Sequence, residues 1–158
     1  MLIIFIPLVT VACGFSPLHT NKGSMEIFRN IDIRKEGTSV AFLIQESLLD
    51  KAPFAESAQK SLHIKPTIKN SYGVITTENE ITRYSVTLNV DFSLYNRETK
   101  KVVLDNKVSA TSDYSAAVTF TGFATEIARR DTFERLANVV AETMITEILT
   151  NKSGEFSQ

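Results

Sequence analysis

Cysteine, tryptophan and histidine are nearly absent from this sequence. Of its 158 residues, one is cysteine, none is tryptophan and two are histidine. A single cysteine excludes a disulfide within the chain and the paired cysteines of zinc or redox motifs, so the fold has to be stabilised by packing. The histidines, His19 and His63, have no serine, cysteine or metal-ligand partner at the spacing of a known motif. We interpret each as an ordinary polar residue.

An excess of charge of either sign is also missing. Lysine and arginine total 17, aspartate and glutamate total 18, and the formal net charge is −1. A broad nucleic-acid-binding face needs clustered positive charge, so we expect no nucleic-acid partner. The sequence contains no glycine-rich phosphate loop, no His-Glu-x-x-His motif and no carboxylate pair whose spacing assigns acid and base roles. We therefore expect a protein that is not an enzyme and holds no metal or cofactor, although distant residues can assemble a site in space.

The apolar run at the start of the sequence is too short to span a membrane. Leu2–Ala12 is about eleven residues, roughly 16 Å as a helix, whereas the hydrocarbon core of a bilayer is roughly 30 Å thick. Cys13 follows the small residue Ala12, which is the order found at the end of a lipoprotein signal. Two features depart from such signals: Thr10 stands where leucine is usual, and no lysine or arginine precedes the run.

We predict that residues 1–12 are a lipoprotein signal peptide and that Cys13 carries a covalent N-terminal lipid. The alternative is that the run forms a buried strand and Cys13 is a core thiol, since free cysteine is often buried. Under the lipoprotein interpretation, residues 13–24 form a lipidated tether. Residues 25–150 are of a size that suits one domain with a single core, and residues 151–158 form a polar tail.

The first half of the domain predicts a strand, a helix and a second strand. Isoleucines alternate within Met25–Arg34, which favours a strand. Thr38 or Ser39 can cap a helix that ends before Pro53. The next strand, Leu62–Lys69, contains Pro66, which favours an edge or a bulge. Asn70–Glu80 is predicted to be a loop, with Gly73 supplying a turn.

The second half predicts a long hairpin followed by a long helix. Apolar and polar residues alternate throughout Arg83–Tyr95, and Val102–Tyr114 continues this pattern after a polar turn. Apolar residues then recur at spacings of three and four over Phe123–Thr150, which indicates a helix. Phe123 and Phe120, on either side of Gly122, are expected in the core.

These elements together predict an α+β fold. Because the strands have one apolar and one polar face, helices must cover one side of the sheet. We expect a two-layer sandwich with a four-stranded mixed sheet and two helices packed on one face. The first helix would serve as the crossover of a parallel strand pair, and the polar face of the sheet would remain available to water or a partner.

The two ends of the chain resemble the LptE family of lipopolysaccharide-assembly lipoproteins. Cys13-Gly14-Phe15-Ser16-Pro17-Leu18 is similar to the Cys-Gly-Phe-x-Pro-Leu of that family. Tyr114-Ser115, then Glu126–Asp131 and Arg135-Leu136-Ala137, resemble its alanine-rich segment, with Thr132 where alanine is common. The resemblance implies a non-enzymatic subunit of the outer-membrane lipopolysaccharide translocon, lipid-anchored on the periplasmic side. Such a subunit plugs the LptD β-barrel, assists its assembly and binds lipopolysaccharide for delivery to the cell surface.

A protein of a different class would share the same features. An auxiliary lipoprotein of a periplasmic lipid-transport ABC system has a tether and a related sandwich, but binds a periplasmic lipid shuttle. A small periplasmic enzyme is a third interpretation, which a deep pocket with convergent titratable groups would favour.

Lipopolysaccharide carries phosphates and acyl chains, so a binder needs cations beside apolar surface. The candidate ligand-binding residues are Arg97, Lys100 and Lys101 in the predicted turn, Lys65 and Lys69 on one strand, and Arg83 on the next. The bland interpretation of each group is a solvated surface. Tyr72, Val74 and Ile75 are candidate partner contacts, because apolar residues in a loop suggest a covered surface.

Overall fold

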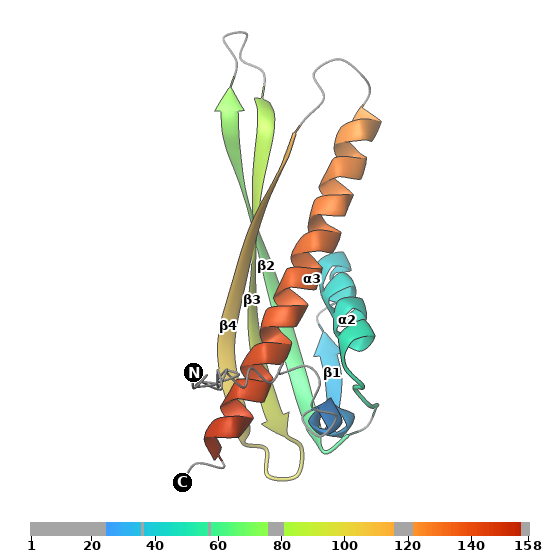
Figure 1. Ribbon diagram of the computed structural model, residues 1–158, viewed down its shortest axis with the longest axis vertical. Coiled ribbons are helices and arrows are strands. Elements are labelled where there is room, and N and C mark those ends of the chain that lie inside the picture. The colour runs from blue at the N-terminus through green and yellow to red at the C-terminus, as the bar shows by residue number, and fades with distance from the viewer. Residues whose placement is uncertain (1–24, 36, 57, 76–80, 116–121, 156–158) are drawn as a thin grey trace, which may run out of the picture.

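The computed structural model describes residues 25–35, 37–56, 58–75, 81–115 and 122–155. In chain order these form the 3-10 helix η2 (Glu26–Asn30), strand β1 (Ile31–Lys35), helix α2 (Ser39–Lys51), strands β2 (Lys60–Ile75), β3 (Ile81–Asn96) and β4 (Val102–Ser115), and helix α3 (Gly122–Glu155). The sheet has the order β1-β2-β3-β4, and β1 is parallel to β2 while the other pairs are antiparallel. Both helices lie on one side of it (Figure 1). The predicted α+β sandwich with a mixed four-stranded sheet is confirmed.

Helix α2 begins and ends where its sequence signals lie. The Thr38 hydroxyl accepts a hydrogen bond from the Ala41 backbone N–H at 3.2 Å, so it satisfies one of the free donors of the first turn. Ala52 is extended and precedes Pro53, which cannot continue the helix. As the crossover between β1 and β2, α2 makes that strand pair parallel.

The core lies between the helices and the apolar face of the sheet. Strand β3 supplies its centre, because every second residue from Val86 to Leu94 is buried. Helix α3 covers these side chains with an apolar stripe whose position around the helix changes gradually from turn to turn. Its buried residues are Phe133, Leu136, Ala137, Val140, Ala141, Met144, Ile145, Ile148 and Leu149. Each large apolar side chain buried in this way contributes roughly 1.5–3 kcal/mol. The predicted alternation of the hairpin is therefore the alternation between core and exposed face.

The segment predicted as a first strand is only half strand. Glu26–Asn30 is a 3-10 helix, and β1 starts at Ile31. The alternation of isoleucines suggested one extended segment, but Phe28 is fully buried and its ring lies 5.0 Å from that of Phe54. Burying this phenylalanine against the segment after α2 turns the chain before it enters the sheet.

Strand β2 is longer than its sequence predicts. The predicted loop Asn70–Glu80 is wrong over its first part, because β2 continues to Ile75 and pairs with β3 without interruption as far as Tyr72. The irregular pairing comes only after Tyr72. Strand β1 pairs with β2 only as far as Ile64, so the following residue, Lys65, begins a free edge. Pro66, which has no N–H to donate, lies in this edge portion as predicted.

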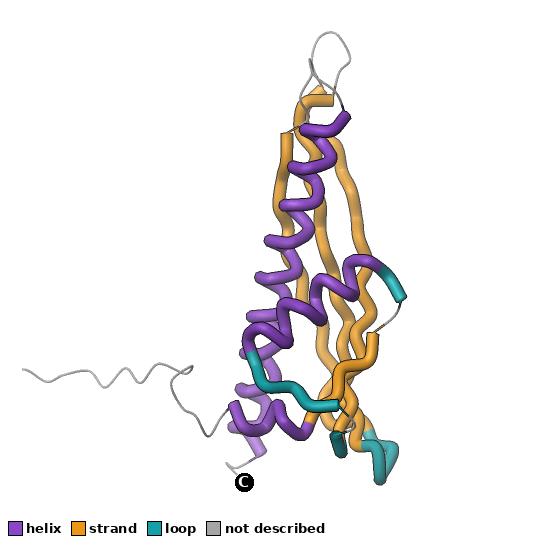
Figure 2. The backbone as a smooth tube through the Cα atoms, turned by 90° about the vertical axis from the view of Figure 1, so that its right-hand side faces the viewer, coloured by secondary structure: helices purple, strands orange, loops and turns teal. Residues whose placement is uncertain are grey.

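The far end of the sheet has only one helix over it. Figures 1 and 2 show that β2, β3 and β4 extend well beyond α2, and only α3 accompanies them. Phe123, at the start of α3, is 72% exposed rather than in the core as expected. Among the described residues, no second helix covers it. Phe120 lies outside the described residues. At the other end, α3 continues past Thr150 to Glu155.

Candidate functional site

The face of the sheet that points away from the helices is polar along most of its length. The strand register places hydroxyl, amide and charged side chains side by side in rows across it. Its members are Ser61, His63, Lys65, Thr67 and Lys69 on β2, Ser85, Thr87, Asn89, Asp91, Ser93 and Tyr95 on β3, and Asp105, Lys107, Ser109, Thr111 and Asp113 on β4. We call this the polar face. The alternation of apolar and polar residues along the strands predicted this polar surface on the side of the sheet away from the helices.

Cross-strand pairs satisfy much of the polar face. The hydroxyls of Thr87 and Thr111 are 2.9 Å apart, and the Ser93 hydroxyl donates to Asp105 at 2.6 Å. Lys107 forms an ion pair with Asp91 at 2.9 Å. The centre of the polar face is therefore rich in hydroxyls. It is also close to neutral, because the charges of Lys107 and Asp91 are of opposite sign and adjacent.

A small hollow lies on the polar face at the end of β1. Its volume is about 320 Å³, and it is lined by Arg34, Lys35, His63, Ile64, Lys65, Asp91, Ser93 and Tyr95. The register brings three of these into one row, since Arg34 lies opposite His63 and His63 lies opposite Ser93. Lys65 stands in the next row, opposite Asp91. We call this the basic hollow.

The carboxylates around the basic hollow are already paired. Asp91 forms the ion pair with Lys107 that is described above. Asp32, in the row next to that of Arg34, forms an ion pair with the Arg34 guanidinium at 3.0 Å. Lys65 has no ion pair among the described residues. A guanidinium, an ammonium and the nearby Tyr95 hydroxyl make a donor set that suits a phosphate or another oxyanion.

Two further side chains of the hollow have their own contacts. The His63 Nε2 lies 3.2 Å from the Ser61 hydroxyl, and its ring packs against that of Tyr95 with centroids 4.8 Å apart. The Lys35 ammonium lies 4.4 Å over the ring of Phe42 on α2, so it leans toward the helix side of the sheet. Arg34 and Lys65 are therefore the cations that face the hollow most directly.

The structure brings only part of the predicted cation set together. Lys65 joins Arg34 and Lys35 in the basic hollow, whereas Lys69 is four residues further along β2, about 13 Å away at ~3.3 Å per residue. Arg83 stands near the far end of the sheet, opposite Ser115. These cations are spread along one face instead of forming a cluster.

The predicted basic turn has two different kinds of residue. Lys100 and Lys101 are exposed in the β3–β4 turn, and Lys100 has the positive φ of 57°. Arg97 is half-buried: its guanidinium forms an ion pair with Asp32, and its backbone N–H donates to the Gln59 carbonyl at 2.9 Å. Arg97 therefore ties the turn to β1, and its charge is neutralised there.

The candidate partner contacts lie on a strand instead of in a loop. Tyr72, Tyr84 and Tyr114 form one row across β2, β3 and β4 on the helix side. The Tyr72 and Tyr84 rings meet edge to face at 5.7 Å, and Tyr84 stacks on Tyr114 at 5.1 Å. Tyr72 remains 64% exposed. Val74 and Ile75 also belong to β2, but their side chains, like Cys13, lie outside the described part of the structure.

Burial and the nearby Arg129–Glu126 pair of α3 shift pKa values around this row. Burial raises the pKa of Tyr114, and the nearby Arg129 charge opposes this effect. The Arg129 guanidinium donates to Glu126 at 2.6 and 2.8 Å, which lowers the pKa of Glu126 and raises that of Arg129. The pair lies on the first turns of α3, near Tyr114 of the tyrosine row.

The described residues contain neither a candidate metal site nor a helix that could span a membrane. Within the described residues, no group of three histidine, cysteine, aspartate or glutamate side chains could hold a metal ion. Among the described helices, none is both long and apolar enough to cross a membrane.

Several solved structures share this fold. No protein-family model matches the chain, and no curated protein sequence matches it. A Caulobacter crescentus CB15 protein, provisionally described as a lipoprotein, has a TM-score of 0.70 and 18% identity, covering 84% of this chain and 97% of its own. Rare lipoprotein B from Shewanella oneidensis has a TM-score of 0.57 and 15% identity, covering 81% of this chain and 98% of its own. A minor lipoprotein from Acinetobacter baumannii has a TM-score of 0.60 and 9% identity, covering 79% of this chain and 93% of its own. At these identities the likeness shows the fold alone, and it is a fold found in bacterial proteins described as lipoproteins.

Proposed function

We propose that this protein is a lipid-anchored, non-enzymatic subunit of the outer-membrane lipopolysaccharide translocon. In that role it plugs and helps to assemble the LptD β-barrel and binds lipopolysaccharide for delivery to the cell surface. The observation that carries the proposal is the uncovered polar face. A surface this long, rich in hydroxyls and nearly neutral, matches the polar interior wall of an outer-membrane barrel.

The start of the sequence supplies the anchor in this proposal. Ala12-Cys13-Gly14 fits a processed lipoprotein, and Gly14 is compatible with outer-membrane sorting because aspartate after the lipidated cysteine is the usual inner-membrane retention signal. The fold supports the proposal because similar structures belong to proteins described as lipoproteins. The protein would then sit on the periplasmic side of the outer membrane.

The basic hollow supports lipopolysaccharide binding. Arg34 and Lys65 can donate to a phosphate, and the polar face around them offers hydroxyls to sugars. Lys69 and Arg83 extend the row of cations along the same sheet, and Lys100 and Lys101 offer a second contact at the turn. In this account Arg97 positions the turn and does not contact the ligand.

Purification of the native lipidated protein from outer-membrane extracts after crosslinking tests the partner. A large outer-membrane β-barrel should co-purify in stoichiometric amount. Isolation without any barrel would overturn the proposal. Capture of an ABC permease or a periplasmic lipid shuttle would favour the auxiliary-lipoprotein alternative instead.

The anchor has its own test. Cys13→Ser should release the protein from membranes and leave its circular dichroism spectrum unchanged, because the thiol holds the lipid and takes no part in the described fold. A Cys13→Ser protein that still fractionates as an integral lipoprotein would contradict the assignment.

A further inference from the structure

A groove separates α2 from α3 on the helix side of the sheet, opposite the polar face. Its volume is about 860 Å³. The α2 wall runs from Ser39 to Asp50, the α3 wall runs from Glu126 to Asn138, and Ile68 of β2 forms the floor. Figure 2 shows α2 crossing α3 at an angle, so the helices lie apart over part of their length.

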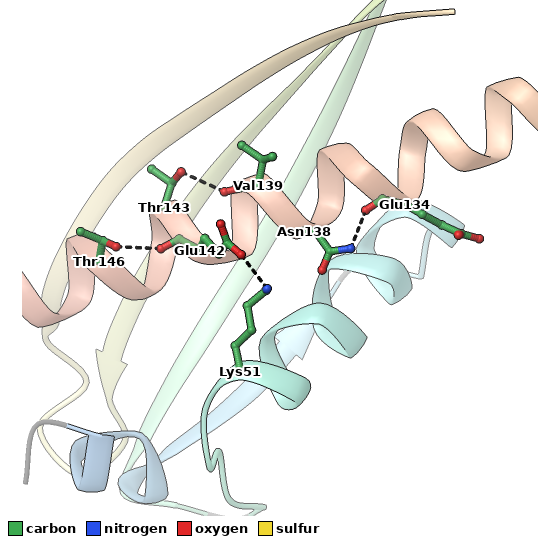
Figure 3. Close-up of polar contacts among 7 residues, drawn as sticks. All are labelled: Lys51, Glu134, Asn138, Val139, Glu142, Thr143 and Thr146. Atoms are coloured by element: carbon green, nitrogen blue, oxygen red, sulfur yellow. Dashed lines mark hydrogen bonds and ion pairs between the residues drawn. The ribbon is translucent and has the colours of Figure 1, made fainter. Parts of the chain in front are cut away.

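The groove closes where the helices are tied together. Lys51, at the end of α2, donates to the Glu142 carboxylate on α3 at 2.8 Å, and Figure 3 shows this ion pair bridging the two helices. Asn138, one turn before Glu142, uses its amide to donate to the Glu134 carbonyl of its own helix at 3.1 Å. The Asn138 side chain is therefore held by a hydrogen bond within α3. The Lys51–Glu142 ion pair marks the closed end of the groove.

Apolar side chains remain accessible inside the groove. Phe42 is 54% exposed and Ile68 is 38% exposed, and Leu43 and Phe133 line the groove beside them. Three elements, α2, β2 and α3, therefore contribute apolar side chains to one groove. Exposed apolar surface of this kind suits a partner with an apolar face of its own.

The charges around the groove favour a partner that carries positive charge. Four carboxylates and two guanidiniums line it, and both guanidiniums are already paired: Arg129 with Glu126 and Arg130 with Glu134. Glu46 and Asp50 have no ion pair among the described residues. The cations just outside the groove are also engaged, Lys51 with Glu142 and Lys35 over the Phe42 ring.

We propose that this groove docks a cationic amphipathic helix from a protein partner. The apolar stripe of the helix lies over Phe42, Ile68 and Phe133, and its lysine or arginine side chains reach Glu46 and Asp50, which stand one turn apart on α2. An anionic lipid is disfavoured here because its phosphate would meet two unpaired carboxylates, whereas the basic hollow accepts such a group on the opposite face. The groove therefore adds a second binding surface, of opposite charge, to the one used in the proposed function.

Calorimetric titration of the full-length protein with a model peptide tests this docking. The probe is a helical peptide of about 14 leucines and lysines, ~21 Å long, and the matched probe has glutamate in place of every lysine. The lysine peptide should bind and the glutamate peptide should not. Glu46→Lys with Asp50→Lys should weaken binding by on the order of tenfold or more. Phe42→Ala should weaken it about tenfold, since it removes the exposed anchor.

Matched variants separate the groove from general surface charge and stickiness. Glu98→Lys with Asp113→Lys makes the same change in net charge at exposed positions outside the groove, and Phe123→Ala removes an exposed phenylalanine that does not line it. Both should bind the lysine peptide with unchanged affinity. Equal affinity for the two peptides, equal losses in the groove and control variants, or a dimer that Phe42→Ala dissolves would each overturn the proposal.

Discussion

Asp32 is the residue that organises the lower end of the polar face. It is 9% exposed and accepts from two guanidiniums, Arg34 on its own strand and Arg97 from the β3–β4 turn. Because the two arginines come from different parts of the chain, this carboxylate fixes both the turn and the cation that faces the basic hollow. Sequence reasoning grouped Arg97 with ligand contacts because the carboxylate that neutralises it lies far away in the chain.

Replacing this carboxylate should cost stability. Asp32→Asn removes a half-buried network and leaves two arginines without their partner, so the free energy of unfolding should fall by about 1–3 kcal/mol. Urea denaturation measures this difference. Asp113→Asn, at an exposed position with no ion pair among the described residues, should stay within about 0.5 kcal/mol of the parent protein. Identical midpoints for the two variants would contradict the role of Asp32.

The contributions of the basic hollow and of the Lys100–Lys101 turn to lipopolysaccharide binding can be tested separately. Lys65→Glu places a second carboxylate beside Asp91 in the hollow and should weaken binding by on the order of tenfold. Lys100→Glu with Lys101→Glu should weaken binding without unfolding the protein, because both side chains are exposed and neither forms an ion pair among the described residues. Affinities measured with purified lipopolysaccharide decide which group contacts the ligand. An unchanged affinity for Lys65→Glu would remove the hollow from the site.

Ionisation of Tyr114 should make the stability of the folded protein depend on pH. Burial raises its pKa in the folded protein above the unfolded value of about 10. The sign follows from linkage: the associated stability is fully present below pH ~10 and is lost as the pH rises through the folded pKa. Tyr114→Phe should therefore show a weaker dependence of its unfolding free energy on pH above ~10 when denaturation is followed across that range. Superimposable alkaline unfolding profiles would contradict the burial of this hydroxyl.

At the scale of elements, the helix cap and the central strand were predictable because each depends on nearby residues. The Thr38 cap acts within one turn, and the alternation of β3 follows from one face being buried. The end of β2 was not predictable in the same way. Asn70 and Gly73 favour a turn on their own, but pairing with β3 extends the strand, and strand preference depends strongly on such context.

The site was the least predictable part for the same reason. Lys65 was visible as a cation on the polar face of its strand, but Arg34 reaches it only through the parallel register of β1 with β2. Nothing in one sequence fixes that register. The only signal was the basic pair at the end of the first predicted strand.

The cap of α2 provides a prediction at this scale. Thr38→Ala removes the acceptor for the Ala41 N–H and should lower stability by about 1 kcal/mol. Ser39→Ala, one residue later and with no cap hydrogen bond, should change stability by less. Thermal or urea unfolding compares the two, and a larger loss for Ser39→Ala would show that the cap is assigned to the wrong residue.

At the scale of the whole molecule, the sandwich has two proposed binding surfaces of different character. One is the polar face with its basic hollow, and the other is the acidic, apolar groove between the helices. The sheet separates them, so both can be occupied at once.

Photocrosslinking in intact outer membranes tests the central claim most directly. A photoreactive side chain is placed at Thr67 on β2 or at Ser109 on β4, two positions of the polar face. Because the polar face is proposed to lie against the barrel wall, both positions should give a covalent adduct with the LptD β-barrel that depends on irradiation. The absence of a barrel adduct from both positions, with the protein folded and membrane-anchored, would contradict the account.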